Sequence, residues 1–138
     1  MYYQDKISFL RDIFDAHHVA LENDNLLVDG RTYAIINDVI IIDQQKKTAG
    51  PDFAPDIQAT FGAEWQTYQA ILPEHQKEFE QYFDLAAPQS FQGKRVCDLG
   101  CGNGRRSYFL RNLCQEMVLG DFSDAIFVAR KNLADSRH

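Results

Sequence analysis

The fold of this chain is decided by the stretch Val96-Cys97-Asp98-Leu99-Gly100-Cys101-Gly102-Asn103-Gly104-Arg105. Its first four residues are typical of a β-strand, the glycines follow at alternate positions, and residues 106–113 have the apolar spacing of a helix. Such glycines let the backbone turn sharply and leave no side chain between the main-chain amides and a ligand. A helix that begins at the turn adds free N–H groups and the positive end of its dipole. The pattern therefore predicts a pocket for a nucleotide-like ligand at the end of a strand.

The residues around the glycines distinguish between classes of nucleotide-binding loop. A P-loop requires Gly-Lys-Ser/Thr after a four-residue gap, and the sequence has no such run. The dinucleotide fingerprint has a glycine or alanine where this chain has Arg105, and it includes no acidic residue at the position of Asp98. A dinucleotide or nucleotide-sugar oxidoreductase is therefore disfavoured, although it stays as an alternative.

A second strand and helix follow the glycine stretch. Residues 117–120, Met-Val-Leu-Gly, are strand-like, and the strand ends at Asp121. Ser123 is placed to cap the next helix. A carboxylate at the end of such a strand is placed to accept two hydrogen bonds from ribose hydroxyls.

Together, VCDLGCGNGR and the downstream VLGDFSDAIFVARKNL resemble the first two motifs of class I S-adenosylmethionine-dependent methyltransferases. The resemblance covers about residues 94–133. It implies an α/β fold, namely the start of a Rossmann-like methyltransferase sheet with its first two βα units, and S-adenosyl-L-methionine as the cofactor. The alternative is a glycine-rich βα turn that binds nothing, which would not require Asp98 or Asp121.

The resemblance also implies which residues hold the cofactor. Gly100, Gly102 and Gly104 would pass close to its methionine part and its sugar. Asp98 would orient its amino group, and Asp121 would hold its ribose. The full set that we expect to bind the cofactor is Asp98, Gly100, Cys101, Gly102, Asn103, Gly104, Asp121 and Phe122.

The chemistry of this family is attack of a substrate oxygen, nitrogen or carbon nucleophile on the sulfonium methyl group. Such enzymes work largely by positioning and desolvation, so the protein needs no nucleophile of its own. The sequence therefore leaves the catalytic residues and the methyl acceptor open.

Composition and charge exclude other classes of function. With 138 residues, 45% of them hydrophobic and 25% charged, the chain has the size and composition of one ordinary globular domain. No apolar run approaches the roughly 18 residues of a membrane span, and residues 1–5 have no signal-peptide character. We therefore expect a cytoplasmic protein without a membrane partner. The net charge of −6 and the lack of long Lys/Arg clusters argue against broad nucleic-acid binding.

The cysteines are Cys97, Cys101 and Cys114, two of them in the glycine stretch. A Cys-x3-Cys pair can suggest metal, but the sequence has no second pair. We therefore expect small, buried, reduced cysteines and no metal site.

Residues 1–45 are predicted to form a small α+β module, a helix followed by a β-meander. Ile7, Leu10, Ile13 and Phe14 recur on one helical face. Short β-prone runs then alternate with polar turn sequences. The predicted strands are residues 19–21, 26–28, 32–36 and 39–42, and the turns are residues 22–25, 29–30 and 37–38.

This module resembles the zinc-ribbon-like segment ahead of some bacterial methyltransferases, and the small activator proteins of tRNA and protein methyltransferases. The resemblance rests on a short helix, a hairpin and residues 29–38, DGRTYAIIND. Those segments usually carry two Cys-x-x-Cys pairs, and this chain has no cysteine before Cys97. His17 and His18 are adjacent and point to different sides, so we expect them to be surface loop residues and not zinc ligands.

Residues 46–93 are predicted to be a linker followed by an amphipathic helical lid. The run Phe61-Gly62-Ala63-Glu64-Trp65 resembles a feature upstream of the glycine loop in such bacterial methyltransferases. Trp65 and Tyr68 share one helical face, and residues 74–83 form a second helical segment. Either the lid only packs on the cofactor domain, or Phe61, Trp65 or Tyr68 borders the methyl-transfer pocket.

Residues 94–138 hold only the first two βα units, so the expected Rossmann-like domain is incomplete. The family's fourth strand should pair with the strand at residues 95–99, and a bare edge there favours self-association. We therefore expect the N-terminal, cofactor-binding part of a methyltransferase, inactive on its own. A non-catalytic interaction or regulatory protein built on a truncated methyltransferase is the alternative.

Overall fold

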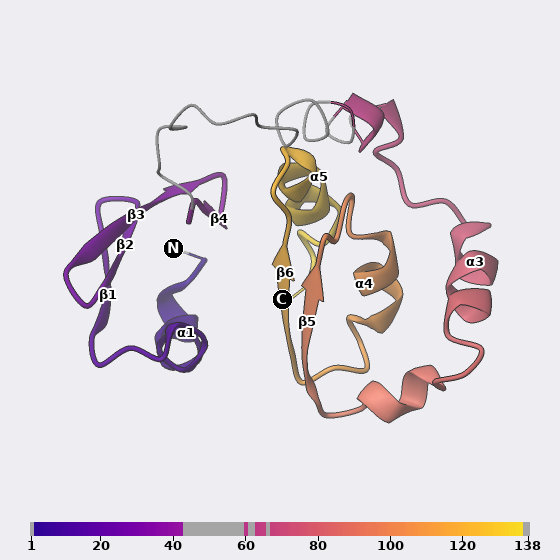
Figure 1. The fold of residues 1–138 in the computed structure, drawn as a ribbon, viewed down its shortest axis with the longest axis horizontal. Coiled ribbons are helices and arrows are strands. Elements are labelled where there is room, and N and C mark those ends of the chain that lie inside the picture. The colour runs from indigo at the N-terminus through magenta and orange to yellow at the C-terminus, as the bar shows by residue number, and fades with distance from the viewer. Residues whose placement is uncertain (1, 43–59, 61–62, 66, 137–138) are drawn as a thin grey trace, which may run out of the picture. The chain divides into compact units, whose positions relative to one another are not determined.

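The computed structural model describes residues 2–42, 60, 63–65 and 67–136. The chain divides into two compact units, Met1–Gly50 and Pro51–His138, and each is described by itself (Figure 1). The fold is mixed α/β. One unit contains a four-stranded antiparallel sheet, and the other contains a two-stranded parallel sheet. None of the helices in the described part of the chain is long and apolar enough to cross a membrane.

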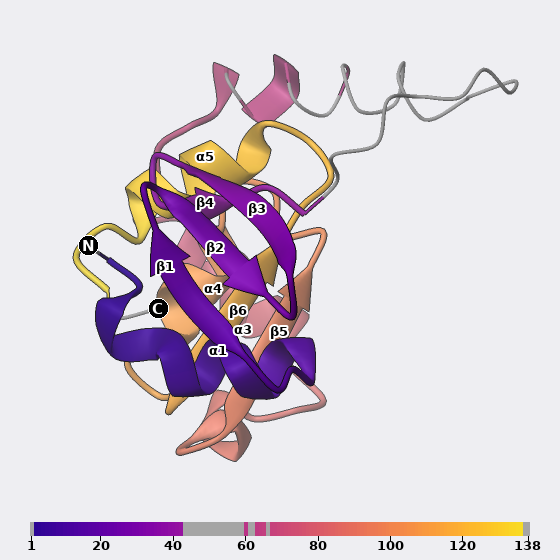
Figure 2. The ribbon, with the colours of Figure 1, turned by 90° about the vertical axis from the view of Figure 1, so that its left-hand side faces the viewer.

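The first unit is a helix followed by a β-meander, as predicted. A short 3-10 helix, η1, leads into the main helix, and the strands then pair in chain order, side by side in Figure 2. The last strand is shorter than the predicted run 39–42, because its ladder with the third strand holds only two residue pairs. The elements are η1 (Gln4–Lys6), α1 (Ile7–Phe14), β1 (Val19–Glu22), β2 (Asn25–Val28), β3 (Arg31–Ile36) and β4 (Val39–Ile40).

All three turns of the meander are two-residue loops in which both residues have positive φ. The pairs are Asn23–Asp24, Asp29–Gly30 and Asn37–Asp38, with φ between 46° and 82°. Loops of this kind match the right-handed twist of the strands that they join, and Asn, Asp and Gly tolerate the left-handed backbone best. The predicted turns are therefore confirmed.

One face of α1 packs on the sheet. Leu10 is buried with Val19, Leu26 and Val28, and Ile7 and Phe14 pack against that cluster. The prediction was wrong for Ile13, whose side chain is exposed. Residues i, i+3 and i+7 form the buried stripe, and Ile13, at i+6, is turned away from it.

His17 and His18 are exposed in the loop between α1 and β1, as expected. Their main-chain N–H groups donate to the two carboxylate oxygens of Asp29, at 3.1 and 2.7 Å. Asp29 thereby ties the turn between β2 and β3 to the start of β1.

The second unit places two parallel strands against helices. The strands pair from Arg95↔Glu116 to Leu99↔Gly120, and Figure 1 shows α4 between β5 and α3. The strand and helix predictions for residues 95–132 are confirmed, except that the first helix ends at Leu110 and not at Leu113. The elements are α3 (His75–Tyr82), η2 (Pro88–Phe91), β5 (Arg95–Leu99), α4 (Arg105–Leu110), β6 (Glu116–Gly120) and α5 (Ala125–Asn132).

Helix α4 ends at Leu110 because the residues after it bond to another part of the unit. The N–H groups of Leu113 and Cys114 both donate to the carbonyl of Leu110, which closes a tight turn. The N–H of Gln115 then donates to the carbonyl of Lys94, at 2.9 Å. This bond draws the chain into β6 before another helical turn can form.

The core of this unit lies on one face of the parallel strands. Phe79 of α3, Leu110 and Cys114 are buried with Met117 of β6, and Val96 packs against them. Because side chains alternate along a strand, Cys97 and Leu99 point to the opposite face. Cys97 is exposed, so the prediction that all three cysteines are buried was wrong for this one.

Candidate functional site

The glycine stretch forms a loop at the carboxyl ends of both parallel strands. Gly100, Gly102 and Gly104 all have positive φ, between 56° and 76°. The N–H groups of Gly100 and Cys101 donate to the carbonyl of Gly120, at 2.8 and 3.2 Å, which fixes the start of the loop to the end of β6. Gly104 is the N-cap residue of α4. The loop therefore joins β5 to a helix N-terminus, as the sequence predicted.

Asp121 closes the loop from the side of β6. Its Oδ2 accepts a hydrogen bond from the N–H of Gly102, at 2.8 Å. Its Oδ1 accepts from both the N–H and the hydroxyl of Ser123, at 2.9 and 2.7 Å. Helix α5 begins at Ala125, and its N-cap residue is Asp124, one residue later than the sequence predicts. The N–H of Ala125 donates to Oγ of Ser123 at 3.3 Å, so the Ser123 side chain still satisfies an N–H group at the start of the helix.

Asp98 lies on the other side of the loop, in the last part of β5. Its Oδ2 accepts a hydrogen bond from the hydroxyl of buried Ser107, at 2.6 Å. Burial raises the pKa of the Cys101 thiol to about 12, and the negative charges of Asp98 and Asp121 add to this effect. Cys101 is therefore a protonated thiol between two carboxylates and not a nucleophile.

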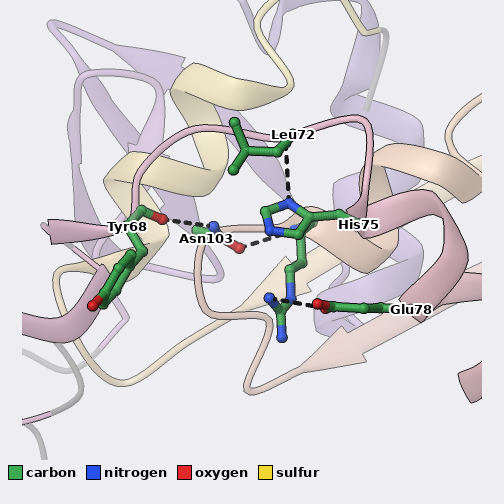
Figure 3. A network of polar contacts seen from close by, with 6 residues as sticks. Tyr68, Leu72, His75, Glu78 and Asn103 are labelled. Carbon is green, nitrogen blue, oxygen red and sulfur yellow. Dashed lines mark hydrogen bonds and ion pairs between the residues drawn. The ribbon is translucent and has the colours of Figure 1, made fainter.

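Asn103 connects the loop to the segment before α3. Its side chain is only 1% exposed. Its Nδ2 donates to the carbonyl of Tyr68, at 3.0 Å, and its Oδ1 accepts from the N–H of Arg105, at 3.2 Å. The Arg105 guanidinium also forms an ion pair with Glu78 of α3, with 3.3 Å between nitrogen and oxygen. Figure 3 shows Asn103 beside Tyr68, with their hydrogen bond as a dashed line.

Asn132, in the last turn of α5, completes this connection and was missed in the sequence. Its Nδ2 donates to the carbonyl of Asn103, at 2.9 Å, and to the carbonyl of Gln69, at 2.8 Å. We call Asn103 and Asn132 the amide latch, since their side chains hold both the loop and the segment at Tyr68–Gln69. The sequence shows only that Asn132 lies near the end of a predicted helix. Asn is too common at that position to predict contacts with distant residues.

Trp65 lies directly against the glycine loop. A Cβ atom on Gly102 would lie 2.8 Å from Cε2 of the Trp65 ring, so glycine is required there by space as well as by φ. The centroid of the same ring is 5.6 Å from Cζ of Arg105. Tyr68 is 67% exposed, and its carbonyl accepts the hydrogen bond from Asn103 of the loop. Phe61 lies outside the described residues.

The other expected site residues have distinct surroundings. A Cβ on Gly104 would lie 3.1 Å from that of Ala129, so this glycine allows α5 to pack closely. Gly100 has open space on its Cβ side. Phe122 follows Asp121 with its side chain exposed. Among the described residues, no three His, Cys, Asp or Glu side chains are grouped to hold a metal ion.

Comparisons with known proteins give no match. No family model matches the chain, and searches of curated proteins and of solved structures return no similar protein. The case for a function therefore depends on the geometry of the loop and on the sequence motifs that form it.

Proposed function

We propose that this chain is the N-terminal, cofactor-binding part of an S-adenosylmethionine-dependent methyltransferase, and that β5, α4, β6 and α5 are the first two βα units of a Rossmann-like domain. One observation carries the proposal. Asp121, at the end of β6, lies within hydrogen-bond distance of Gly102, in the middle of the loop that follows β5. Ligands of parallel α/β sheets bind at the carboxyl ends of the strands, where these two residues meet.

The residues at the loop fit the polar groups of such a cofactor. A carboxylate oxygen has about two lone-pair positions. Oδ1 of Asp121 uses both for Ser123, whereas Oδ2 has only the Gly102 N–H among the described residues. Oδ2 can therefore accept one ribose hydroxyl directly. The second ribose hydrogen bond that we expected requires Ser123 to release one of its two bonds.

Asp98 and Gly100 would serve the other end of the cofactor. Within the described part of the chain, the second oxygen of the Asp98 carboxylate accepts no hydrogen bond and could bind an amino group, and the open side of Gly100 would let the ligand approach the main chain. When bound, the cofactor supplies a methyl group on a sulfonium ion, which a nucleophile of the acceptor can attack. The chain's own residues bind and orient it, and the Trp65 ring excludes water from the loop at Gly102.

A cytoplasmic location is part of this proposal. None of the three cysteines forms a disulfide bond, which is usual in a reducing compartment.

Calorimetric titration with S-adenosylmethionine tests the proposal. We expect the wild-type chain to bind and Gly102→Val to abolish binding, because a side chain there meets both Trp65 and the ligand. The matched control is Gly93→Val. Gly93 has a similar φ of 67° but open space around its Cβ position, so this variant carries the backbone strain without the obstruction. Equal binding by wild type and Gly102→Val would refute the proposal. A folded wild-type chain that does not bind would favour the non-catalytic alternative.

A further inference from the structure

The single tryptophan of the chain lies against the glycine loop, beside Gly102 and Arg105. A Cβ atom on Gly102 would lie within 3.0 Å of Cε2, Cζ2 and Nε1 of Trp65, so the ring edge that carries the indole nitrogen fills the space beside this glycine. Gly102 is also the residue whose N–H binds Asp121. The ring therefore borders the same few atoms to which we assign cofactor binding, and it is only half-buried.

The amide latch holds the ring in this position. The main-chain N–H of Tyr68 donates to the carbonyl of Glu64, which makes one helical turn across Trp65. The carbonyls that end this turn, those of Tyr68 and Gln69, accept from Asn103 and Asn132. Trp65 is thus held at the loop by one partly buried and one exposed hydrogen bond as well as by packing, and its position is a defined feature of the site.

The charges at this position favour a cation. Two carboxylates, Asp98 and Asp121, flank the loop, and their combined field contributes to the raised pKa of Cys101 between them. Among the described residues, Arg105 is the basic side chain that lies over the Trp65 ring. Its positive charge is balanced by the ion pair with Glu78. A loop flanked by two carboxylates attracts positive charge, unlike the glycine loops that bind phosphate.

Aromatic rings attract cations through their quadrupole when the charge lies within about 6 Å of the ring centroid. The distance from Arg105 shows that the Trp65 ring already lies near one cation. We propose that Trp65 is a specificity-determining residue, whose ring favours the positively charged sulfonium cofactor over its neutral thioether product, S-adenosylhomocysteine. This inference rests on the proposed function. In this role Trp65 makes the site bind the cofactor more tightly than the product, so the product leaves first. The residues of the glycine motif do not explain such a difference.

The test is the ratio of the two affinities, measured by calorimetry for S-adenosylmethionine and S-adenosylhomocysteine. Trp65→Leu keeps an apolar side chain but removes the ring. It should reduce the preference for the charged ligand by roughly three- to tenfold, the size of one cation–π contact. Trp65→Phe keeps a weaker aromatic face and should retain part of the preference. The matched control is Tyr68→Leu, in the same turn, where an exposed ring is removed and no change is expected.

The outcomes separate the two proposals. If Trp65→Leu weakens both ligands by the same factor, Trp65 is only a wall of the pocket, and this inference is overturned while the proposed function stands. If Tyr68→Leu changes the ratio as much as Trp65→Leu does, the effect belongs to the whole turn and the inference also fails. If neither ligand binds the folded wild-type chain, the proposed function itself fails. In wild type, the emission of the single tryptophan should change on binding of either ligand.

Discussion

The main-chain N–H of Gly102 donates to Oδ2 of Asp121 over 2.8 Å, and this hydrogen bond joins residues 19 positions apart in the sequence. It links the loop after β5 to the residue after β6, so the shape of the loop depends on the charge of Asp121. A hydrogen bond to an ionised group is stronger than one between neutral groups. Substitutions at Asp121 should therefore affect both the loop and any ligand that it holds.

We predict that Asp121→Ala weakens binding of S-adenosylmethionine more than Asp121→Asn. Each charge-assisted hydrogen bond contributes roughly 1.5–3 kcal/mol, so alanine should raise the Kd by at least about tenfold. Asparagine keeps one acceptor oxygen and should lie between wild type and alanine. Calorimetric titration measures all three, with the exposed neighbour Asp124→Ala as the control that should bind as wild type does. Unchanged affinity in both Asp121 variants would mean that the loop is purely structural.

We also predict that Asn132→Ala and Asn132→Asp release the segment around Trp65 to the same extent. Both remove the donor that serves the carbonyls of Asn103 and Gln69, although Asp keeps the shape of the side chain. One of these bonds is exposed and the other is partly buried, so losing each should cost the net value of an ordinary hydrogen bond, about 0.5–1.5 kcal/mol. Thermal unfolding should begin several degrees lower, and tryptophan emission should shift to longer wavelength as Trp65 becomes solvated.

Lys131→Ala is the control for the amide latch. It changes an exposed side chain next to Asn132 on α5 and leaves the Asn132 side chain and both acceptor carbonyls in place. Its melting temperature and emission should match those of wild type. An Asn132→Asp variant indistinguishable from wild type would show that the latch contributes nothing to the position of Trp65.

The elements that the sequence predicts correctly are those with local causes. The turns at Asn23–Asp24, Asp29–Gly30 and Asn37–Asp38 follow from residue types that tolerate positive φ within a two-residue loop. The strand, glycine turn and helix at residues 95–110 follow from a pattern contained within that stretch. In both cases the residues that determine the conformation are adjacent in the chain.

The features that the sequence does not predict depend on distant partners. The end of α4 is set by the bond between Gln115 and Lys94, and Asn132 acts on Gln69 from 63 positions away. No periodicity or motif marks such pairs in a single sequence. The exposure of Cys97 also depends on distant parts of the chain. The sequence shows that side chains alternate along β5, but it does not show which face of the strand the helices cover.

The cysteines should differ sharply in reactivity. At pH 8, iodoacetamide should modify exposed Cys97 first, and Cys101 and buried Cys114 only on unfolding. The pKa of Cys101 is raised to about 12 from its ordinary value of 9.0, so its thiolate is scarce in the folded chain. Peptide mass mapping after timed labelling checks this order. Early labelling of Cys101 would contradict the placement of its thiol between Asp98 and Asp121.

The raised pKa of Cys101 also has a consequence for stability. Between pH about 9 and 12, the folded chain keeps the thiol proton while the unfolded chain loses it. The stabilisation is present below pH 9 and is lost as the pH rises through this window, so the free energy of unfolding should fall. Cys101→Ala should flatten this pH dependence in denaturant titrations at pH 8 and pH 10, whereas Cys97→Ala, at an exposed position, should not.

Finally, we predict that the chain self-associates through β5. Among the described residues, β6 is the one strand that pairs with β5, and Leu99 on β5 is 79% exposed. An exposed edge strand with apolar side chains is a template for pairing with another chain, and a lysine on such an edge discourages it. In sedimentation velocity runs over a concentration series, wild type should form dimers or larger species, and Leu99→Lys should shift the distribution toward monomer. The control is Leu85→Lys, which changes an even more exposed leucine outside the strands and should behave as wild type. A wild-type chain that stays monomeric at every concentration would show that this edge is already protected.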